Sequence, residues 1–390
     1  MPNFYNYTQD GLVYSFDDVF VPADAFREGN LFTWGKNLYG NLGNNTRIPR
    51  CTPVTTFAGG TNWKQVGAGD EHCAAIKTDG TLWTWGRGSS GALGDNTIFS
   101  RSTPVTTFAG GTNWKQVGTS GNHCAAIKTD GTLWTWGNNG YGKLGNNTTT
   151  TRCTPVTTFA GGTNWKQVGA GDEHCAAIKT DGTLWTWGRG SSGALGNNTT
   201  ITRSTPVTTF AGGTDWKQVS AGYKQSAAIK TDGTLWTWGN NGYGQLGDNT
   251  TTTRCTPVTT FAGGTDWKQV GAGYNHCAAI KTDGTLWTWG GNLNGNLGDN
   301  TTTSRSTPVT TFAGGTNWKQ VGAGYKQSAA IKTDGTLWTW GNNGYGQLGD
   351  NTTITRSTPV TTFAGGTNWK QVGAGDEHCA AVTFIDYVIE

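Results

Sequence analysis

The chain has 390 residues, and its 28 basic and 25 acidic side chains leave a formal net charge of +3. Both signs are scattered along the chain, which argues against a nucleic acid or an anionic membrane as partner. No apolar run approaches the ~20 residues that span a bilayer, and the N-terminus lacks the pattern of a signal peptide, so we expect a soluble protein without membrane insertion. Glycine (62 residues) and tryptophan (20 residues) are abundant, which favours short strands and tight turns.

Residues 1–26 precede the repeats and form a leader. Leu12–Phe16 and Val19–Val21 have the β-branched and aromatic content of short strands, and Pro22 ends the second one. We interpret the leader as an attachment arm whose aromatic contacts come from Tyr14, Phe16 and Phe20.

After the leader, a Trp-Gly pair recurs every 51 residues, at Trp34, Trp85, Trp136, Trp187, Trp238, Trp289 and Trp340. Seven copies at one fixed period, with no insertion, indicate a repeat architecture. The repeat therefore outweighs chain length as a guide to domain organisation.

Each repeat contains four segments typical of short strands. In the first unit they are Thr52–Phe57, Trp63–Val66, Cys73–Ile76 and Leu82–Trp85, and Asp79-Gly80 is a hairpin signal between the last two. Four short strands per repeat predict an all-β, seven-bladed β-propeller with four strands per blade.

The two ends of the chain predict how the ring closes. The last repeat departs from the pattern after Val382, without the hairpin and without the Trp-Thr-Trp strand, whereas Leu31–Gly35 supplies that strand near the N-terminus. We expect one blade to pair this N-terminal strand with C-terminal strands, which leaves no open sheet edge. The predicted parts are the leader at 1–26, the propeller at 27–384 and a C-terminal extension at 385–390.

The repeat reads Val-Gly-Ala-Gly-x-x-His-Cys-Ala-Ala-Ile-x-x-Asp-Gly-Thr-Leu-Trp-Thr-Trp-Gly. It resembles the repeat of the regulator of chromosome condensation family over residues 27–384, and the resemblance implies a seven-bladed propeller. It implies no single activity, because members of that family include a guanine-nucleotide exchange factor, a plant ultraviolet-B photoreceptor and a secreted β-lactamase inhibitor. Function is then expected in the loops.

Two of those activities are not expected here. The photoreceptor would need Trp beside Arg at the two positions before His, which here hold pairs such as Asp70-Glu71, Gly121-Asn122 and Tyr223-Lys224. The exchange factor works through segments inserted into the repeats, and its chromatin binding uses a basic tail; this chain has neither.

The leader, of the type Tyr-Ser-Phe-Asp-Asp-Val-Phe-Val-Pro, resembles leaders on propeller proteins of tailed, particularly marine, bacteriophages. That resemblance implies a non-catalytic surface, tail or capsid-associated protein of the virion, bound to neighbouring virion subunits or to a host surface component. The alternative is a cytoplasmic regulatory or inhibitory propeller that binds a protein partner.

Five units contain a His-Cys pair, which suggests zinc binding or nucleophilic catalysis. Two other units hold Gln225-Ser226 and Gln327-Ser328, which supply neither a thiolate nor an equivalent metal ligand. We therefore predict a structural role, with no catalytic residue, no metal and no cofactor. A second set of cysteines, Cys51, Cys153 and Cys255, could bridge to the His-Cys cysteines, but we predict free thiols because no signal peptide is present.

The tryptophans have two interpretations, an aromatic binding platform or a packed core. Their recurrence in every repeat favours packing between blades. A glycosidase site built from converging carboxylates is a further alternative, and the strict repetition disfavours it.

The positions at which the repeats differ are the most informative for function. Three units have an acidic pair before His and a basic residue in the loop after the next Trp-Gly, which joins Asp70-Glu71 with Arg87, Asp172-Glu173 with Arg189 and, if the ring closes, Asp376-Glu377 with Lys36. We expect these loops to meet on one face, with surface ion pairs worth roughly 0–1 kcal/mol. We interpret that face as a recognition surface with partner-binding residues Tyr39, Tyr141, Tyr223, Tyr243, Tyr274, Tyr325, Tyr345, Arg87 and Arg189.

Overall fold

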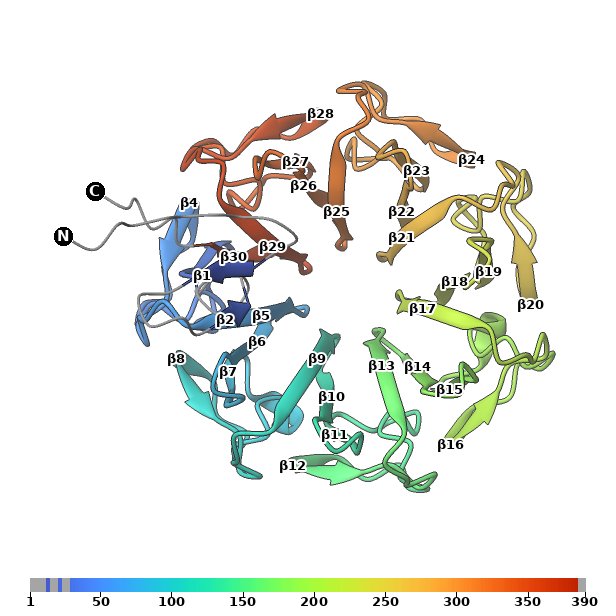
Figure 1. The fold of residues 1–390 in the computed structure, drawn as a ribbon, viewed down its shortest axis with the longest axis horizontal. Coiled ribbons are helices and arrows are strands. Elements are labelled where there is room, and N and C mark those ends of the chain that lie inside the picture. Colours follow the sequence, from blue (N-terminus) through green and yellow to red (C-terminus); the bar gives the residue numbers. More distant parts are fainter. Residues whose placement is uncertain (1–11, 15–19, 23–28, 385–390) are drawn as a thin grey trace.

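The computed structural model of the chain describes residues 12–14, 20–22 and 29–384. Seven four-stranded antiparallel sheets radiate as blades around a central channel (Figure 1). This arrangement confirms the predicted all-β, seven-bladed propeller. Short 3₁₀ turns lie at Ser89–Gly91 and Ser191–Gly193, and no helix within the described residues is long and apolar enough to cross a membrane.

In six of the seven blades the strands follow chain order from the channel to the rim (Figure 1). The first blade contains β5 (Trp63–Ala68), β6 (His72–Lys77), β7 (Leu82–Gly86) and β8 (Arg101–Thr106). The next five blades repeat this order, with β9 (Trp114–Ser120), β10 (His123–Lys128), β11 (Leu133–Gly137), β12 (Arg152–Thr157); β13 (Trp165–Ala170), β14 (His174–Lys179), β15 (Leu184–Gly188), β16 (Arg203–Thr208); β17 (Trp216–Ala221), β18 (Gln225–Lys230), β19 (Leu235–Gly239), β20 (Arg254–Thr259); β21 (Trp267–Ala272), β22 (His276–Lys281), β23 (Leu286–Gly290), β24 (Arg305–Thr310); β25 (Trp318–Ala323), β26 (Gln327–Lys332), β27 (Leu337–Gly341), β28 (Arg356–Thr361).

The predicted order of strands within a blade is wrong by one strand. The sequence predicts that the strand containing Thr-Pro-Val opens its blade, whereas the structure pairs it with the preceding Trp-Thr-Trp strand, with Trp83 opposite Thr106 and Gly86 opposite Arg101. The Trp-Thr-Trp strand is therefore third in its blade and not fourth. A repeat period has the same length wherever the unit is taken to begin, so it defines the number of blades but not their first strand.

The seventh blade closes the ring with both ends of the propeller. It contains β29 (Trp369–Ala374), β30 (His378–Thr383), β3 (Leu31–Gly35) and β4 (Arg50–Thr55). The strands β3 and β30 are antiparallel, with Leu31 opposite Val382 and Gly35 opposite His378. The predicted closure is confirmed, but the N-terminal part supplies two strands of this blade rather than one.

Glutamine side chains join the innermost strands of neighbouring blades. The Gln65 amide donates to the carbonyl oxygen of Val117 at 3.2 Å and accepts the Val117 N–H at 3.1 Å. The same paired contact joins the last blade to the first, where Gln371 bonds Val66 at 3.3 and 3.0 Å. We call this junction between the C-terminal strand β29 and the N-terminal strand β5 the seam of the ring. The seam has the same hydrogen bonds between blades as the other junctions.

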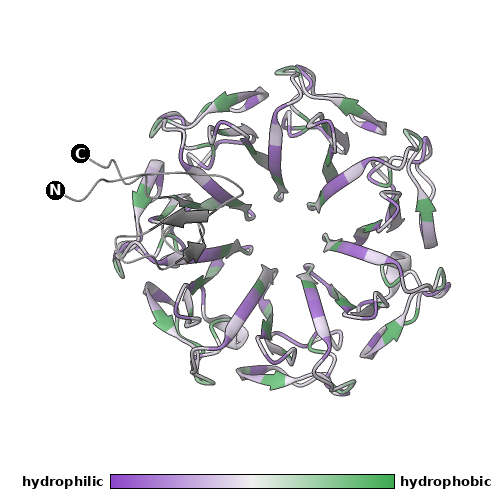
Figure 2. Cartoon of the chain, in the orientation of Figure 1, coloured by the Kyte–Doolittle hydropathy of each residue, from purple (hydrophilic) through white to green (hydrophobic). Residues whose placement is uncertain are grey.

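The core lies between the blades. Trp63 is fully buried and meets Trp83 and Trp85 edge-on at 6.3 and 6.4 Å, and its cluster includes Leu31 and Val382 of the neighbouring blade. This confirms packing between blades as the role of the repeated tryptophans. Figure 2 shows that the innermost strands also have a hydrophilic segment, where each contains Lys-Gln.

In the leader, β1 (Leu12–Tyr14) and β2 (Phe20–Pro22) form an antiparallel pair, with Tyr14 opposite Phe20. Phe16 lies outside the described residues, as does the C-terminal extension at 385–390. Attachment through Tyr14, Phe16 and Phe20 remains a prediction.

Candidate binding site at one mouth of the channel

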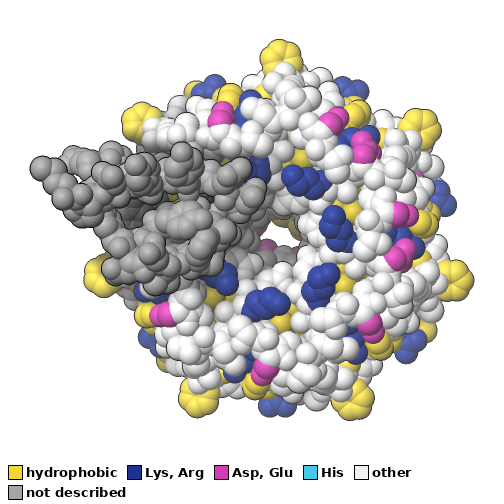
Figure 3. Space-filling model, in the orientation of Figure 1, with side chains coloured by type: hydrophobic (Ala, Val, Ile, Leu, Met, Phe, Trp, Pro, Cys, Tyr) yellow, Lys and Arg dark blue, Asp and Glu magenta, His cyan; other side chains and the backbone are white. Residues whose placement is uncertain are grey.

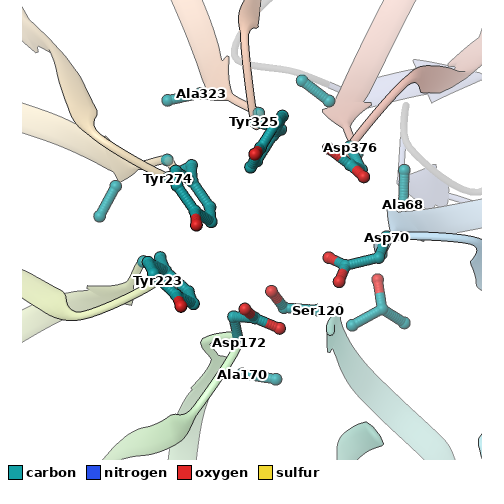
Figure 4. A pocket seen from close by; sticks show the side chains of 18 of the residues that line it. Ala68, Asp70, Ser120, Ala170, Asp172, Tyr223, Tyr274, Ala323, Tyr325 and Asp376 are labelled. Carbon is teal, nitrogen blue, oxygen red and sulfur yellow. The ribbon is translucent and has the colours of Figure 1, made fainter. Parts of the chain in front are cut away.

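The positions at which the repeats differ converge on one end of the channel. Each innermost strand ends at a small residue, and one position of the following turn faces the channel. The residues there form a ring in blade order, Asp70, Gly121, Asp172, Tyr223, Tyr274, Tyr325 and Asp376. We call this end the channel mouth; it encloses a cavity of about 220 Å³ (Figure 4).

One half of the mouth is aromatic. The rings of Tyr223 and Tyr274 stack at 4.0 Å between centroids with an angle of 13°, and Tyr274 meets Tyr325 edge-on at 4.1 Å. Burial and hydrogen bonding to the two neighbouring phenols raise the pKa of Tyr274. The Tyr274 phenol is therefore neutral at physiological pH, and the three rings form one continuous aromatic wall.

The other half of the mouth is acidic. Figure 4 shows the carboxyl groups of Asp70, Asp172 and Asp376 on the side of the cavity opposite the tyrosines. Burial, reinforced by the charges of Asp172 and Asp376, raises the pKa of Asp70 to about 8. Burial and the charge of Glu377 raise the pKa of Asp376 to about 7, and burial also raises the pKa of Asp172. At neutral pH this half is partly protonated, because burial and neighbouring acidic groups disfavour the charged form of the carboxyls.

Gly121 lets two of these carboxyls approach each other. Its N–H donates to Oδ1 of Asp70 at 3.0 Å, and a Cβ on Gly121 would lie 2.2 Å from Oδ1 of Asp172. The residue also has a φ of +51°, which favours glycine. This explains why the second repeat has neither Asp nor Tyr at the position where every other repeat has one of them.

Lys143 is a buried cation beside the acidic half. Its Nζ donates to the backbone oxygen of Asp172 at 3.1 Å, and burial lowers its pKa. The corresponding positions of the other repeats hold Asn, Ala or Gln. The mouth thus departs from sevenfold symmetry in two ways: Lys143 occurs in one repeat only, and the aspartates occur in three.

In each acidic pair the glutamate forms an ion pair with a basic residue, whereas the aspartate faces the cavity. Glu71 and Arg87 form an ion pair, as do Glu173 and Arg189, and Lys36 bonds Glu377 at 2.7 Å. Lys36 also reaches Glu71 of the next blade at 3.2 Å. Burial alone would lower the pKa of Lys36, but hydrogen bonds to Glu377 and Glu71 raise it. The two variable loops therefore meet on one face, as the sequence predicts, and the Lys36 contact forms through ring closure.

The loops after Trp-Gly place four tyrosines outside this ring of charges. Arg87 lies 4.9 Å from the ring centre of Tyr39, Arg189 lies 4.6 Å from that of Tyr141, and Lys36 lies 5.4 Å from that of Tyr345. Tyr243 is 45% exposed, and the next blade has Gly291 in place of a basic residue. The nine residues predicted to bind a partner thus separate into three cavity tyrosines, four loop tyrosines and two paired arginines.

The residues that sequence reasoning placed wrongly are Asp70, Asp172 and Asp376. The sequence predicts that each acidic pair acts as one surface ion-pairing unit, but only the Glu forms the ion pair while the Asp faces the channel. Alternation along an extended chain, which sends neighbouring side chains to opposite sides, could have distinguished them.

The His-Cys pairs lie between blades and do not line the mouth cavity. His378 Nε2 lies 3.1 Å from Cys73 Sγ of the next blade, and His174 Nε2 lies 2.7 Å from Ser226 Oγ. Burial lowers the pKa of His174 to about 4 and raises that of Cys175 to about 12. The rings are therefore neutral and the thiols protonated, which fits a structural role, and all eight cysteines are free as predicted.

The two ends of the channel differ in charge. Figure 3 shows basic side chains around the opening on the viewed face, and the second residue of every innermost strand is a lysine, Lys64, Lys115, Lys166, Lys217, Lys268, Lys319 or Lys370. The aspartates follow the opposite ends of these strands, about 20 Å away for a six-residue strand. The expectation of evenly scattered charge is wrong at the channel because the fold sorts residues that alternate in the sequence.

Comparison with known proteins identifies the repeats. An RCC1-like domain matches residues 100–387, and the regulator of chromosome condensation (RCC1) repeat matches residues 28–76 and 63–92. The chain is 31% identical over 326 residues to the ultraviolet-B receptor UVR8 of Arabidopsis thaliana, a match that covers 82% of this chain and 74% of the receptor. It is 29% identical over 367 residues to the Homo sapiens E3 ubiquitin-protein ligase HERC2, covering 90% of this chain and 8% of the ligase.

Solved structures show the same fold. Yeast RCC1 (Prp20) bound to Kap60 has a TM-score of 0.81 at 19% identity, covering 93% of this chain and 90% of that one. Human WBSCR16 has a TM-score of 0.79 at 21% identity, covering 91% of this chain and 99% of that one. With the matching repeats and the identity to UVR8, these findings show that the chain belongs to the RCC1 repeat family.

Proposed function

We propose that the chain is a non-catalytic propeller that binds a protein partner at the channel mouth and the loops around it. The observation that supports this best is where the repeats differ. Strands, hairpins and core residues are nearly the same in all units, whereas the mouth positions and the loops beside them change from unit to unit. Surface that departs from an otherwise uniform repeat is where a specific partner would be recognised.

The composition of this face suits a protein partner. Tyr141, Tyr243 and Tyr345 are 40%, 45% and 37% exposed, and tyrosine and arginine are enriched at the centres of protein interfaces. Cation contacts hold the rings of Tyr141 and Tyr345 in place, so less side-chain entropy is lost on binding.

A non-catalytic role is supported by the positions of the reactive groups. The His rings and thiols that could act as bases or nucleophiles face each other between blades. The hydroxyl groups that line the mouth, those of Thr119, Ser120, Ser220 and the three tyrosines, have no histidine beside them among the cavity-lining residues. Such a cavity offers recognition groups rather than a catalytic set.

A cellular regulatory propeller is favoured over a virion protein. The relatives described above are cellular proteins, and the structural studies of yeast Prp20 concern its binding to Kap60, Gsp1p and histones. A protein partner for this chain is our extension from those relatives. The virion role depends on the leader, most of which lies outside the described residues, and it remains a prediction.

Site-specific photo-crosslinking tests the proposed function. A benzophenone amino acid placed at Tyr243 would crosslink a discrete protein in an extract of the cells that contain this chain. The same probe at Phe210, on a connection at the far end of β16, or at Lys217, at the far end of the innermost strand, would not give that product. We expect Y243A/Y345A to abolish the product when the crosslinker is placed at Tyr141. Equal products from all positions, or a product unaffected by Y243A/Y345A, would refute partner binding at this face.

A further inference from the structure

We propose that the channel mouth binds one cationic side chain, a lysine or arginine of the protein partner, between its three carboxyls and its three phenol rings. This inference rests on the proposed function and specifies the chemical group that the site accepts. Its basis is a cavity with two chemically different halves, together with three carboxyl groups that no salt bridge among the described residues reaches.

The cavity is large enough for a side chain. Its volume of about 220 Å³ is several times the ~30 Å³ that a water molecule occupies in the liquid. Small residues at the ends of the innermost strands, such as Ala170, Ala272 and Ala323, line the cavity and leave its volume unfilled. A lysine or arginine could therefore enter along the channel axis.

The three aspartates at the mouth lack ion-pair partners. The neighbouring Glu71, Glu173 and Glu377 are all paired with Lys or Arg, but among the described residues no salt bridge reaches Asp70, Asp172 or Asp376. Lys143 donates to the backbone oxygen of Asp172 and not to its carboxyl group. Oδ1 of Asp376 is buried and has no hydrogen-bond partner in the described part of the chain. An entering cation would supply the missing donor.

The tyrosine half of the mouth attracts cations within the chain itself. Lys224 lies 4.5 Å from the ring centre of Tyr223, and Lys326 lies 4.8 Å from that of Tyr325. Tyr274, between these two tyrosines, has a ring that borders the cavity (Figure 4). A cation between this wall and the carboxyls would have phenol groups on one side and carboxyl oxygens on the other.

Proton release would accompany binding. Asp70 and Asp376 have pKa values of about 8 and 7, so a cation that binds near pH 7 must displace protons from them. Binding should strengthen as pH rises from 6 to 9, because the carboxyls ionise over that range. The other charged groups around the mouth are Lys36, Lys143, Lys224, Lys326, Arg87, Arg189 and the three glutamates.

The test uses the full chain and two small probes of matched shape. Butylguanidinium is positively charged throughout this pH range, and butylurea is its neutral counterpart. Isothermal titration calorimetry at pH 6, 7.5 and 9 would show butylguanidinium binding at least about tenfold more tightly than butylurea, with an affinity that rises about tenfold from pH 6 to 9. Equal affinity for both probes, or no butylguanidinium binding, would overturn the proposal without any variant having to fold.

Two variants locate the site. D70N/D376N should weaken butylguanidinium binding about tenfold and flatten its pH dependence. D79N is the matched control: it makes the same chemical change in an exposed turn next to Lys77, at the far end of the blade, and should bind as the unaltered chain does. Unchanged binding in D70N/D376N places the probe elsewhere and also refutes the proposal.

The outcome is independent of the crosslinking experiment. If butylguanidinium binds as expected but the Tyr243 crosslink fails its controls, the cation site stands and the proposed protein-binding function fails. If the crosslink meets its controls but butylguanidinium and butylurea bind alike, the function stands and the cation site fails.

Discussion

The imidazole Nε2 of His378 lies 3.1 Å from the thiol of Cys73, so that the last blade contacts the first through a buried pair. Equivalent pairs join other blades, for example His72 with Cys124. Where serine replaces cysteine, Ser226 donates its only hydroxyl proton to the Ala194 carbonyl at 3.1 Å, so His174 must donate from Nε2. Burial keeps the His174 ring neutral, so its Nδ1 is an acceptor without a partner among the described residues.

Stability should consequently fall in mild acid. Burial lowers the pKa of His72 to about 4 and that of His378 to about 3, whereas an unfolded histidine titrates near 6.5. The unfolded chain therefore binds protons that the buried histidines cannot bind. The free energy of unfolding is at its full value above pH 6.5 and decreases as pH falls towards 4. Asp70 and Asp376 oppose this trend because their raised pKa values favour the folded state as pH falls. With five histidines against three aspartates at the mouth, we expect a net loss.

The variant H72Q tests this origin of acid sensitivity. It creates a Gln–Cys pair between blades. The same combination is already present where Gln225 meets Cys277 of the next blade. At pH 7.5 we expect unfolding free energies within about 1 kcal/mol of the unaltered chain, and at pH 4.5 a relative gain of about 2–3 kcal/mol, both from urea unfolding. K217Q, at an exposed site, is the control. Identical pH dependence in H72Q and the unaltered chain would contradict the assignment.

Substituting Gly121 by alanine should destabilise the mouth. The new Cβ would lie 2.2 Å from Oδ1 of Asp172, at a φ of +51°. We expect a loss of about 2–4 kcal/mol in unfolding free energy, from backbone strain and from displacement of a buried carboxyl.

Gly110 separates those two causes. It has nearly the same backbone angle, φ +54°, but a Cβ there would meet nothing within 4 Å. G110A should therefore cost only the strain, about 1 kcal/mol. Equal losses in G110A and G121A would show that the Asp172 contact is unimportant.

The seam of the ring should be as strong as its continuous joints. Q371A removes the amide that bonds Val66 across the seam, and Q218A removes the equivalent bonds to Val270 within the chain. Each variant leaves a Val N–H without its partner, so we expect losses of about 1–3 kcal/mol in chemical denaturation, equal within about 0.5 kcal/mol. A much larger loss for Q371A would mean that the seam is the weak joint.

The exposed phenylalanines at the rim should be dispensable for folding. Figure 3 shows hydrophobic side chains projecting at intervals around the circumference. Seven phenylalanines at equivalent positions, Phe57, Phe108, Phe159, Phe210, Phe261, Phe312 and Phe363, are 65–66% exposed. F210S should change the free energy of unfolding by no more than about 0.5 kcal/mol, because folding buries little of the apolar surface of this side chain. A loss like that of a core residue would contradict this.

The repeat sequence predicts the architecture because every structural position occurs in most units. Trp63 and its equivalents could be assigned to the core from their recurrence, and the missing strand after Val382 predicted ring closure. The pairing of β7 with β8 could not be predicted, because periodicity does not define where a blade begins. The opposed halves of the mouth could not be predicted either, since they depend on blades far apart in the chain, such as those of Asp70 and Tyr274, facing one cavity.

The two-ended seventh blade also bears on synthesis. Of the strands that form blades, the pair of β3 and β4 is translated first, but its partner β30 ends at Thr383. At ~5–20 residues per second, the first hairpin waits on the order of tens of seconds with an unpaired edge, while each later blade can complete itself as it emerges. An open strand edge recruits other strands. On a crowded polysome, the β3–β4 pairs of adjacent nascent chains are therefore open to pairing with one another, and a chaperone that shields them would act at the start of the ring.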